Sequence, residues 1–177
     1  FDEPLIESPP EKVTDEIKEI GRYVTQLVND GSTIQLGIGR IPHAVAECLT
    51  TRRDLGIHTE MFTDGIINLV KSGAVTGAQK TINRGKIIAS FALGTKRLFD
   101  FINSNPLVEL HPSEYVNDPL VISQHDNMVA INVALEVDLT GQVCADSIGY
   151  RFYSGIGGQV DFIRGASRSE GGKPIIA

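Results

Sequence analysis

The chain has 177 residues, a length that suits one domain with its own hydrophobic core. Its residues are 41% hydrophobic and 21% charged, the composition of an ordinary globular protein. The net charge is -6 and no run of Lys or Arg exceeds two residues, which argues against nucleic acid or an anionic membrane as the main partner. No apolar run approaches the roughly 20 residues that a membrane-spanning helix requires, so no membrane segment is expected.

Both ends of the chain indicate a piece of a longer protein. Residues 1–10 contain three prolines, no hydrophobic periodicity and none of the features of a signal peptide. They are expected to form a linker before a domain over residues 11–177. Residue 1 is Phe, and the final stretch "KPIIA" has the pattern of a buried strand that has just begun. The alternative is a natural terminus that docks into a sheet.

The first two thirds of the chain alternate between helix and strand patterns. Apolar residues recur at helical spacing over residues 11–28, and the turn residues that follow end the helix. Strand patterns then cover residues 32–39, 55–62, 86–94 and 107–112, and helix patterns cover 41–53, 64–73 and 95–105. This alternation predicts an α/β fold with a mostly parallel, open sheet flanked by helices.

The third quarter has a different pattern. Residues 131–139 alternate strictly between apolar and polar side chains, and Thr140-Gly141 then turns the chain into a second short strand. This pattern predicts a β-hairpin with one wet or partner-covered face. The chain then passes through a glycine loop into a helix, and a last strand begins at Lys173.

Several common types of site lack their sequence signals. Cys48 and Cys144 lie far apart without C-x-x-C spacing, which favours two reduced thiols in an intracellular protein over a disulfide. The four histidines have no ligand-like spacing, so no metal site is expected. Neither a G-x-S-x-G elbow nor a Walker A lysine is present, which argues against a serine hydrolase and a P-loop protein.

Two glycine loops stand between a strand or loop and a helix. The first, with Gly37 and Gly39, resembles G-x-G-x-x-G without its third glycine, and a tight turn explains it equally well. The second holds Gly155, Gly157 and Gly158 directly before a helix. Three glycines in four residues cost backbone entropy, which favours a site whose backbone N–H groups bind an anion or a carbonyl oxygen.

Among the carboxylates, Glu60 is the strongest candidate for chemistry. Glu136 and Asp138 fit a solvated strand face, and Asp64 and Asp161 stand in the first turns of helices, where capping or the helix dipole explains them. Glu60 lies at the C-terminal end of a predicted strand, where ligands bind in open α/β sheets.

Five motifs in order resemble the class I coenzyme A transferases, and within them the acetyl-CoA hydrolase/transferase branch, which includes 4-hydroxybutyrate and butyrate:acetate CoA-transferases. The motifs are "LGIGRIPHAV", "DLGIHTEMFTDG", "HPSEYVNDP", "QHDNMVAINVALEVDLTGQV" and "GIGGQVDFIRGA". The resemblance covers residues 32–177. It implies that the chain is the start and middle of a C-terminal half, truncated at its own C-terminus.

The resemblance also implies a ping-pong transfer of CoA between an acyl-CoA and a short-chain carboxylic acid of the acetate, butyrate or 4-hydroxybutyrate type. The nucleophile of such enzymes is a glutamate in a Thr-Glu stretch, which is Glu60 in this chain. Asn117 resembles a family asparagine beside the CoA arm, and the two glycine loops resemble segments that bind CoA and the oxyanion. Arg40 departs from the small residue that many relatives carry, and its role stays open.

Further expectations follow from the same resemblance. CoA and acyl-CoA are substrates, and no cofactor is held permanently. The active site would lie between this chain and the missing N-terminal half of the same enzyme, so the isolated chain would be an inactive module that binds CoA weakly. A homodimer is implied, and bacterial cytoplasm or mitochondrial matrix suits the reduced cysteines. An acyl-CoA hydrolase on the same scaffold is the alternative, because water can replace the acceptor acid.

Overall fold

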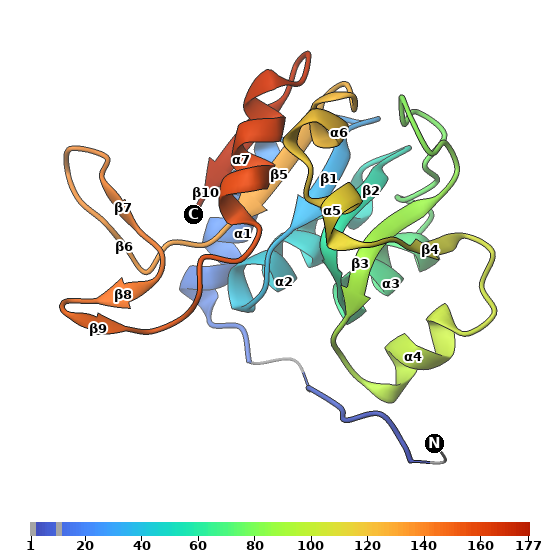
Figure 1. Ribbon diagram of the computed structural model, residues 1–177, viewed down its shortest axis with the longest axis horizontal. Helices are drawn as coiled ribbons and strands as arrows, with labels where there is room; N and C mark the ends of the chain where they lie inside the picture. Colours follow the sequence, from blue (N-terminus) through green and yellow to red (C-terminus); the bar gives the residue numbers. More distant parts are fainter. Residues whose placement is uncertain (1–2, 10–11) are drawn as a thin grey trace.

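The computed structural model describes residues 3–9 and 12–177 and contains a single large parallel sheet (Figure 1). Six strands pair in the order β10-β5-β1-β2-β3-β4, and every pair in this sheet is parallel. The strands are β1 (Thr33–Leu36), β2 (Gly56–Phe62), β3 (Ile87–Ala92), β4 (Val108–Leu110), β5 (Met128–Asn132) and β10 (Lys173–Ile176). The predicted α/β fold with a mostly parallel sheet is confirmed.

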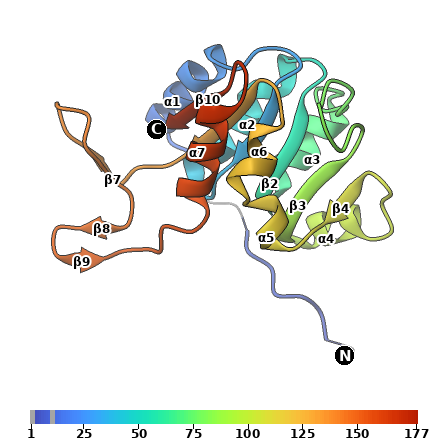
Figure 2. The same cartoon turned by 45° about the horizontal axis from the view of Figure 1, so that its top comes forward.

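Helices cover both faces of this sheet, as Figures 1 and 2 show. One face carries α1 (Asp15–Gln26), α2 (Arg40–Cys48), η1 (Leu49–Thr51), α3 (Asp64–Lys71) and α4 (Lys96–Ile102), and the other carries α5 (Ser113–Val116), α6 (Pro119–Ser123) and α7 (Gln159–Arg168). Alternate residues of β5 enter two separate apolar clusters: Val129 and Ile131 join the first, and Met128 and Ala130 join the second. A strand buried on both faces shows no polar alternation, which is typical of a parallel sheet.

The predicted helix over residues 11–28 is shorter in the structure. α1 begins at Asp15, after Thr14, whose hydroxyl accepts a hydrogen bond from the N–H of Ile17, and it ends at Gln26. Residues 10 and 11 lie outside the described residues, as do residues 1 and 2. Residues 3–9 form neither helix nor strand, and the linker over residues 1–10 stays a prediction.

The predicted hairpin that starts in residues 131–139 is wrong in its extent. Residues 128–132 belong to β5 in the parallel sheet, and the chain then leaves the sheet. Two hairpins follow: β6 (Glu136–Val137) pairs with β7 (Val143–Cys144), and β8 (Ser147–Ile148) pairs with β9 (Arg151–Phe152). The sequence does not show where the strand leaves the sheet, because the alternation of apolar and polar residues that begins at residue 131 continues past the end of β5 into β6.

Together, residues 133–158 form an arm that extends away from the sheet on one side of the molecule (Figures 1 and 2). We call this segment the hairpin arm. It starts directly after β5 and ends directly before α7, so its base lies next to the N-terminus of that helix.

The short helices α5 and α6 were not expected from the sequence, because four and five residues are too few to show helical periodicity. The two cysteines, Cys48 and Cys144, are both free, as predicted. Within residues 3–9 and 12–177, every helix is too short or too polar to pass through a lipid bilayer.

Candidate active site

The candidate site lies at the carboxyl edge of the sheet, where β1 and β2 end. Glu60, in β2, is partly buried and points towards the face that α5 and α7 cover. Asn117 directly follows α5, and Gly158 directly precedes α7. Two segments that are distant in sequence therefore come together on one carboxylate.

Both oxygens of the Glu60 carboxylate accept a hydrogen bond. The side-chain Nδ2 of Asn117 donates to Oε1 at 3.0 Å, and the backbone N–H of Gly158 donates to Oε2 at 3.2 Å. One donor on each oxygen suits an ionised carboxylate, which only accepts hydrogen bonds. Together the two donors fix the plane of the carboxylate and leave its remaining lone pairs available to a substrate.

A side chain at position 158 would displace the Glu60 carboxylate and the Asn117 amide. A Cβ at this residue would lie 2.6 Å from Oε2 of Glu60 and 2.6 Å from Nδ2 of Asn117. Gly157 has a φ of +57°, in the left-handed region that side chains disfavour. The close approach of the loop to the carboxylate thus explains Gly158, and the backbone conformation explains Gly157. A Cβ at Gly155 would meet no atom within 4 Å, so packing does not require glycine there.

Asn117 is held by the short helices on either side of it. Its backbone N–H donates to the carbonyl of Ser113 at 2.8 Å and closes the last turn of α5. The carboxylate of Asp118 then accepts from the N–H of Leu120 at 2.8 Å and caps α6, which begins with a proline. The tight elbow between α5 and α6 leaves the Asn117 amide pointing at β2.

The first glycine loop lies at the same edge but bonds to a different strand. The N–H of Gly37 donates to the carbonyl of Ile131 at 2.8 Å. Beside it, the amides of Gln35 and Asn132 form a reciprocal, buried pair, with distances of 3.3 and 3.0 Å. Gly39, with a φ of +102°, faces open space at the start of α2. Gly37 and Gly39 therefore flank the site, and the described hydrogen bonds of Glu60 come from the second loop.

Among the other carboxylates, Asp138 and Asp64 bind turn and loop groups, and Asp161 lies in the first turn of α7. Glu136 is exposed, and Asp138 accepts from the N–H groups of Thr140 and Gln142 in the turn of the first arm hairpin. The hydroxyl of Thr140 and these backbone donors lower the pKa of the Asp138 carboxyl. The expectation that Asp64 caps its own helix is wrong. Its two oxygens instead bind the N–H and the hydroxyl of Thr95, at 2.9 and 2.7 Å, the residue directly before the next helix, α4.

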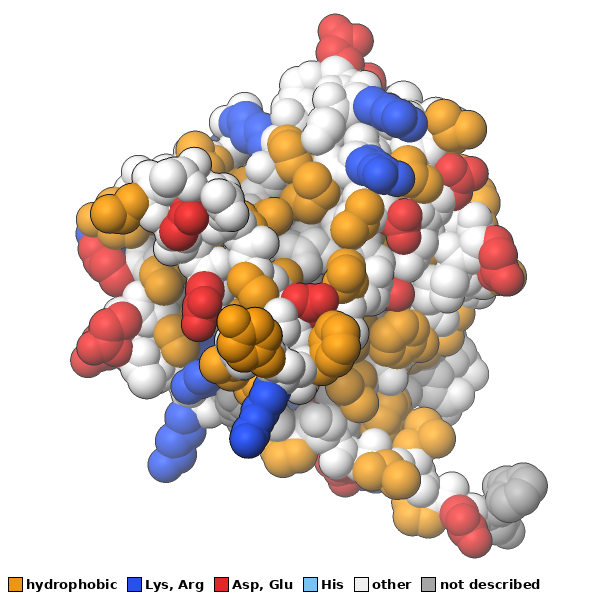
Figure 3. All heavy atoms as spheres, turned by 60° about the vertical axis from the view of Figure 1, so that its left-hand side comes forward, with side chains coloured by type: hydrophobic (Ala, Val, Ile, Leu, Met, Phe, Trp, Pro, Cys, Tyr) orange, Lys and Arg blue, Asp and Glu red, His pale blue; other side chains and the backbone are white. Residues whose placement is uncertain are grey.

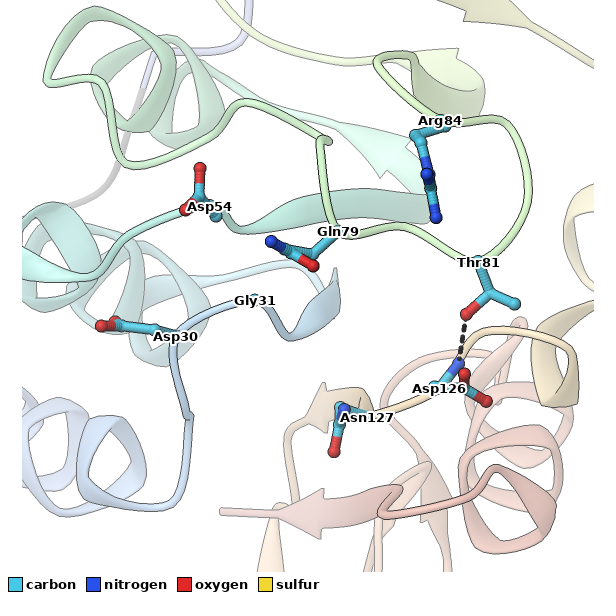
Figure 4. A pocket seen from close by; sticks show the side chains of 8 residues that line it. All are labelled: Asp30, Gly31, Asp54, Gln79, Thr81, Arg84, Asp126 and Asn127. Carbon is cyan, nitrogen blue, oxygen red and sulfur yellow. Dashed lines mark hydrogen bonds between the residues drawn. The ribbon is translucent and has the colours of Figure 1, made fainter.

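A polar cavity of about 460 Å³ lies at the other end of the sheet (Figure 4). It is lined by residues that precede the strands: Asp30, Gly31, Asp54, Gln79, Thr81, Arg84, Asp126 and Asn127. The hydroxyl of Thr81 accepts from the N–H of Asp126 at 3.0 Å across this cavity. Because it opens at the amino ends of β1, β2 and β5, it is separate from Glu60. Within the described part of the chain, no group of three His, Cys, Asp or Glu residues could hold a metal ion.

Residues 94–177 match the family model of the acetyl-CoA hydrolase/transferase C-terminal domain. The chain is also 54% identical, over 98% of its own length, to the 4-hydroxybutyrate coenzyme A transferase of Clostridium kluyveri. Residues 94–177 therefore belong to the acetyl-CoA hydrolase/transferase C-terminal domain family. It spans 41% of that relative and 37% of the butyryl-CoA:acetate CoA-transferase of Anaerostipes caccae, to which it is 42% identical over 92% of its length.

The same family appears among solved structures. The crystal structure of a 4-hydroxybutyrate CoA-transferase from Porphyromonas gingivalis superposes with a TM-score of 0.86 and 45% identity, covering 97% of this chain and 40% of that one. A more distant member, the acetyl-CoA hydrolase of Candida albicans, is 29% identical over 77% of the chain and 26% of its own length. The chain spans about two fifths of the length of its closer relatives.

Proposed function

We propose that the complete protein transfers CoA between an acyl-CoA and a short-chain carboxylic acid, with Glu60 as the nucleophile. Acetate, butyrate and 4-hydroxybutyrate are the proposed acids, because relatives at 42–54% identity bear those names. The observation that carries the proposal is the Glu60 carboxylate, held at the carboxyl edge of a parallel sheet by Asn117 and the N–H of Gly158. No permanent cofactor is proposed, and acyl-CoA and the acid are the substrates.

The reaction has two matched halves. One Glu60 oxygen attacks the thioester carbonyl, the C–S bond breaks, and an acyl-glutamyl anhydride and CoA thiolate result. The thiolate then attacks the glutamyl carbonyl and expels the acyl group as a carboxylate, which leaves a glutamyl-CoA thioester. An acceptor carboxylate reverses these steps, so the kinetics are ping-pong. Each intermediate stays activated, which requires that water be excluded.

The two donors on Glu60 have a role in the second attack. When the thiolate adds to the glutamyl carbonyl, one glutamyl oxygen takes up negative charge and the other leaves with the acyl group. The N–H of Gly158 and the amide of Asn117 lie within hydrogen-bond distance of these oxygens, so one of them stabilises the oxyanion. Gly155 and Gly157 continue this loop, and Gly37 and Gly39 flank it. We assign these four glycines to the binding of CoA.

The proposal is tested by trapping the intermediate. The complete protein is incubated with acetyl-CoA or butyryl-CoA and treated with borohydride, which reduces a glutamyl thioester, and the peptides are analysed by mass spectrometry. A modified Glu60, absent in Glu60→Gln, is the expected result. Modification of Glu136 instead would overturn the site assignment, and release of CoA without any adduct would overturn the covalent mechanism.

Hydrolysis is the second candidate, supported by the relation to the Candida albicans acetyl-CoA hydrolase. In that reaction, water resolves the glutamyl intermediate in place of an acid. The measurement is CoA release with and without added acetate or butyrate. Release that depends on the acid supports transfer, and an unchanged rate without acid supports hydrolysis.

The partners are proposed from the length of the relatives. The matched family model describes a C-terminal domain, so we assign the remaining three fifths of the protein mainly to an N-terminal half. We propose that this half packs against the hairpin arm and completes the active site, and that the isolated chain is therefore inactive and binds CoA weakly. A homodimer is also proposed, as is a location in the cytoplasm or, alternatively, the mitochondrial matrix, which the free Cys48 and Cys144 support.

Apolar side chains on the arm support the docking of this half (Figure 3). The side chains of Leu139 and Tyr150 are fully exposed, and Phe152 is 88% exposed. Large side chains of this kind, gathered on one segment, mark a surface that is covered in the complete protein. The arm leads through Ile156 directly into Gly157 and Gly158, so the segment that covers it also lies beside Glu60.

A further inference from the structure

Two buried histidines lie beneath the site and have no part in the proposed chemistry. The side chains of His58, in β2, and His125, after α6, are fully buried, and their ring centroids are 4.7 Å apart. The pKa of His58 is lowered to about 4, mainly by burial and to a smaller extent by the nearby Lys80 and His111, while the hydrogen bond with the Val116 carbonyl raises it. Burial also lowers the pKa of His125 to about 2. Both imidazoles are therefore neutral near pH 7.

Among the described residues, the His58 side chain forms one hydrogen bond, and it joins β2 to α5. Its Nε2 lies 2.8 Å from the carbonyl oxygen of Val116, the last residue of α5. A carbonyl only accepts, so Nε2 carries the proton and Nδ1 the lone pair. Nδ1 has no partner in the structure. The neutral imidazole thus uses its one N–H to fix a carbonyl at the end of a helix, where intrahelical partners are missing.

The Val116 carbonyl directly precedes Asn117, the residue whose amide binds Glu60. The Nδ2 of Asn117 donates to Oε1 of Glu60 at 3.0 Å. The other amide atom, Oδ1, is buried without a partner. Apart from Glu60, no side chain among the described residues forms a hydrogen bond with the Asn117 amide. The position of this amide therefore depends on the end of α5. His58 and Glu60 are two residues apart, on the same face of β2.

We propose that His58 is a positioning residue, whose Nε2–H fixes the Val116 carbonyl and so places the Asn117 amide on the Glu60 carboxylate. β2 then supplies both the nucleophile and the anchor for the group that orients it. This inference rests on the proposed function of Glu60, and it assigns His58 no contact with the substrate.

The test compares two variants of the complete protein. In His58→Gln the side-chain amide keeps an N–H donor near the position of Nε2, and in His58→Leu a side chain of similar size has none. The glutamyl-CoA thioester is trapped in single turnovers. For His58→Leu we expect its rate of formation to fall about 10-fold to 100-fold, with little change in the KM for acyl-CoA, because a small misplacement of the reacting group costs this much. His58→Gln should restore the rate to within a few fold of wild type.

His125→Leu is the matched control, since it removes the other buried ring and leaves the bond to Val116 intact. It should leave the rate within a few fold of wild type. A wild-type rate in His58→Leu would overturn the inference. An equal loss of rate in His58→Leu and His125→Leu, or no rescue by His58→Gln, would also overturn it, because the effect would then follow packing alone.

A crystal structure of His58→Leu keeps this test separate from the proposed function. The expected result is an Asn117 amide that has moved out of hydrogen-bond distance of Glu60, whatever the reaction is. An unchanged contact at 3.0 Å would overturn the inference. Failure of the proposed function has a different signature, the absence of a Glu60 adduct in the unsubstituted protein.

Discussion

At the scale of single residues, the orientation of Glu60 depends on Gly158, which has no side chain. The backbone of Gly158 approaches Oε2 to 3.2 Å, and a Cβ at this position would lie 2.6 Å from the same oxygen. Real Cβ atoms do not approach neighbours so closely, so the carboxylate would have to leave its two donors. Glycine is needed here for space, and its conformational freedom matters at the preceding residue.

Gly158→Ala in the complete protein should therefore reduce the rate of glutamyl-CoA formation by about 10-fold to 100-fold, because the proposed nucleophile, Glu60, loses its orientation. Ser167→Ala, at an exposed position of α7, the helix that follows this loop, is the matched control, because its side chain lies outside the proposed site. Single-turnover trapping and thermal unfolding measure both variants. Equal rates in the two variants would contradict the close approach seen at position 158.

The buried histidines predict acid sensitivity. Their pKa values lie near 4 for His58 and near 2 for His125, below the ordinary value of 6.5, so the unfolded chain binds protons that the folded chain does not. The free energy of unfolding should fall as pH drops from about 6.5 to about 4, by at most about 1.4 kcal/mol per pH unit for each histidine, and the part due to His125 continues to fall towards pH 2.

Urea unfolding of the complete protein and of His125→Leu, between pH 7 and 4.5, measures this dependence. Exposed carboxylates titrate in both proteins, so the comparison isolates one histidine. Stability should decrease more steeply with acid in the unsubstituted protein. Parallel pH profiles would mean that His125 is as easily protonated in the folded state as in the unfolded chain.

At the scale of elements, the contact between α6 and α7 sets the distance between Asn117 and Gly158. Gly165 of α7 faces Ile122 of α6, and a Cβ there would lie 2.4 Å from Cγ2 of that isoleucine. Asn117 lies just before α6, and α7 begins directly after Gly158. The spacing of the two helices therefore controls the two donors on Glu60.

Gly165→Ala should destabilise the protein by about 1–3 kcal/mol, because overpacking forces the two helices apart. The loss would occur although alanine favours a helix over glycine by roughly 0.5–1 kcal/mol. Thermal unfolding measures the effect, and Ser167→Ala, on the exposed side of the same helix, should change stability far less. A stabilised Gly165→Ala would show that α6 and α7 can separate without cost.

At the scale of the whole molecule, the hairpin arm is the part that this chain leaves uncovered. In each of its two hairpins, two residues of one strand pair with two residues of the other, and neither hairpin joins the parallel sheet. Isolated hairpins of this size are marginal in water. The proposed N-terminal half would supply the apolar contacts that hold the arm in place.

Hydroxyl-radical footprinting of the complete protein tests this proposal. Tyr150 and Phe152 should be oxidised several-fold more slowly in the native protein than after unfolding in urea, although both are largely exposed in this chain. Tyr23 on α1, which is 58% exposed, provides the reference. Rapid oxidation of the arm in the native protein would contradict the proposal, and protection that disappears on dilution would assign the arm to a second copy.

Much of the fold was predictable because its signals are local. Apolar spacing in residues 15–26 and the turn that follows indicate α1, and continuous apolar runs indicate the strands of a parallel sheet. The arm was predicted only as a hairpin, since alternation over residues 131–139 continues unchanged where β5 leaves the sheet. α5 was not predicted at all, although it places Asn117 and accepts the bond from His58.

The sequence by itself determined the class of fold, the place of Glu60 at the end of a strand and the glycines beside it, because propensity, periodicity and turn chemistry act between near neighbours. Only the tertiary structure decided which groups meet the carboxylate. Asn117 and Gly158 lie 57 and 98 residues beyond Glu60, and each reaches it through crossovers and helix packing that no local pattern encodes. The pairing of His58 with Val116, 58 residues away, was decided in the same way, since a buried polar group takes whichever partner the packed chain brings within reach.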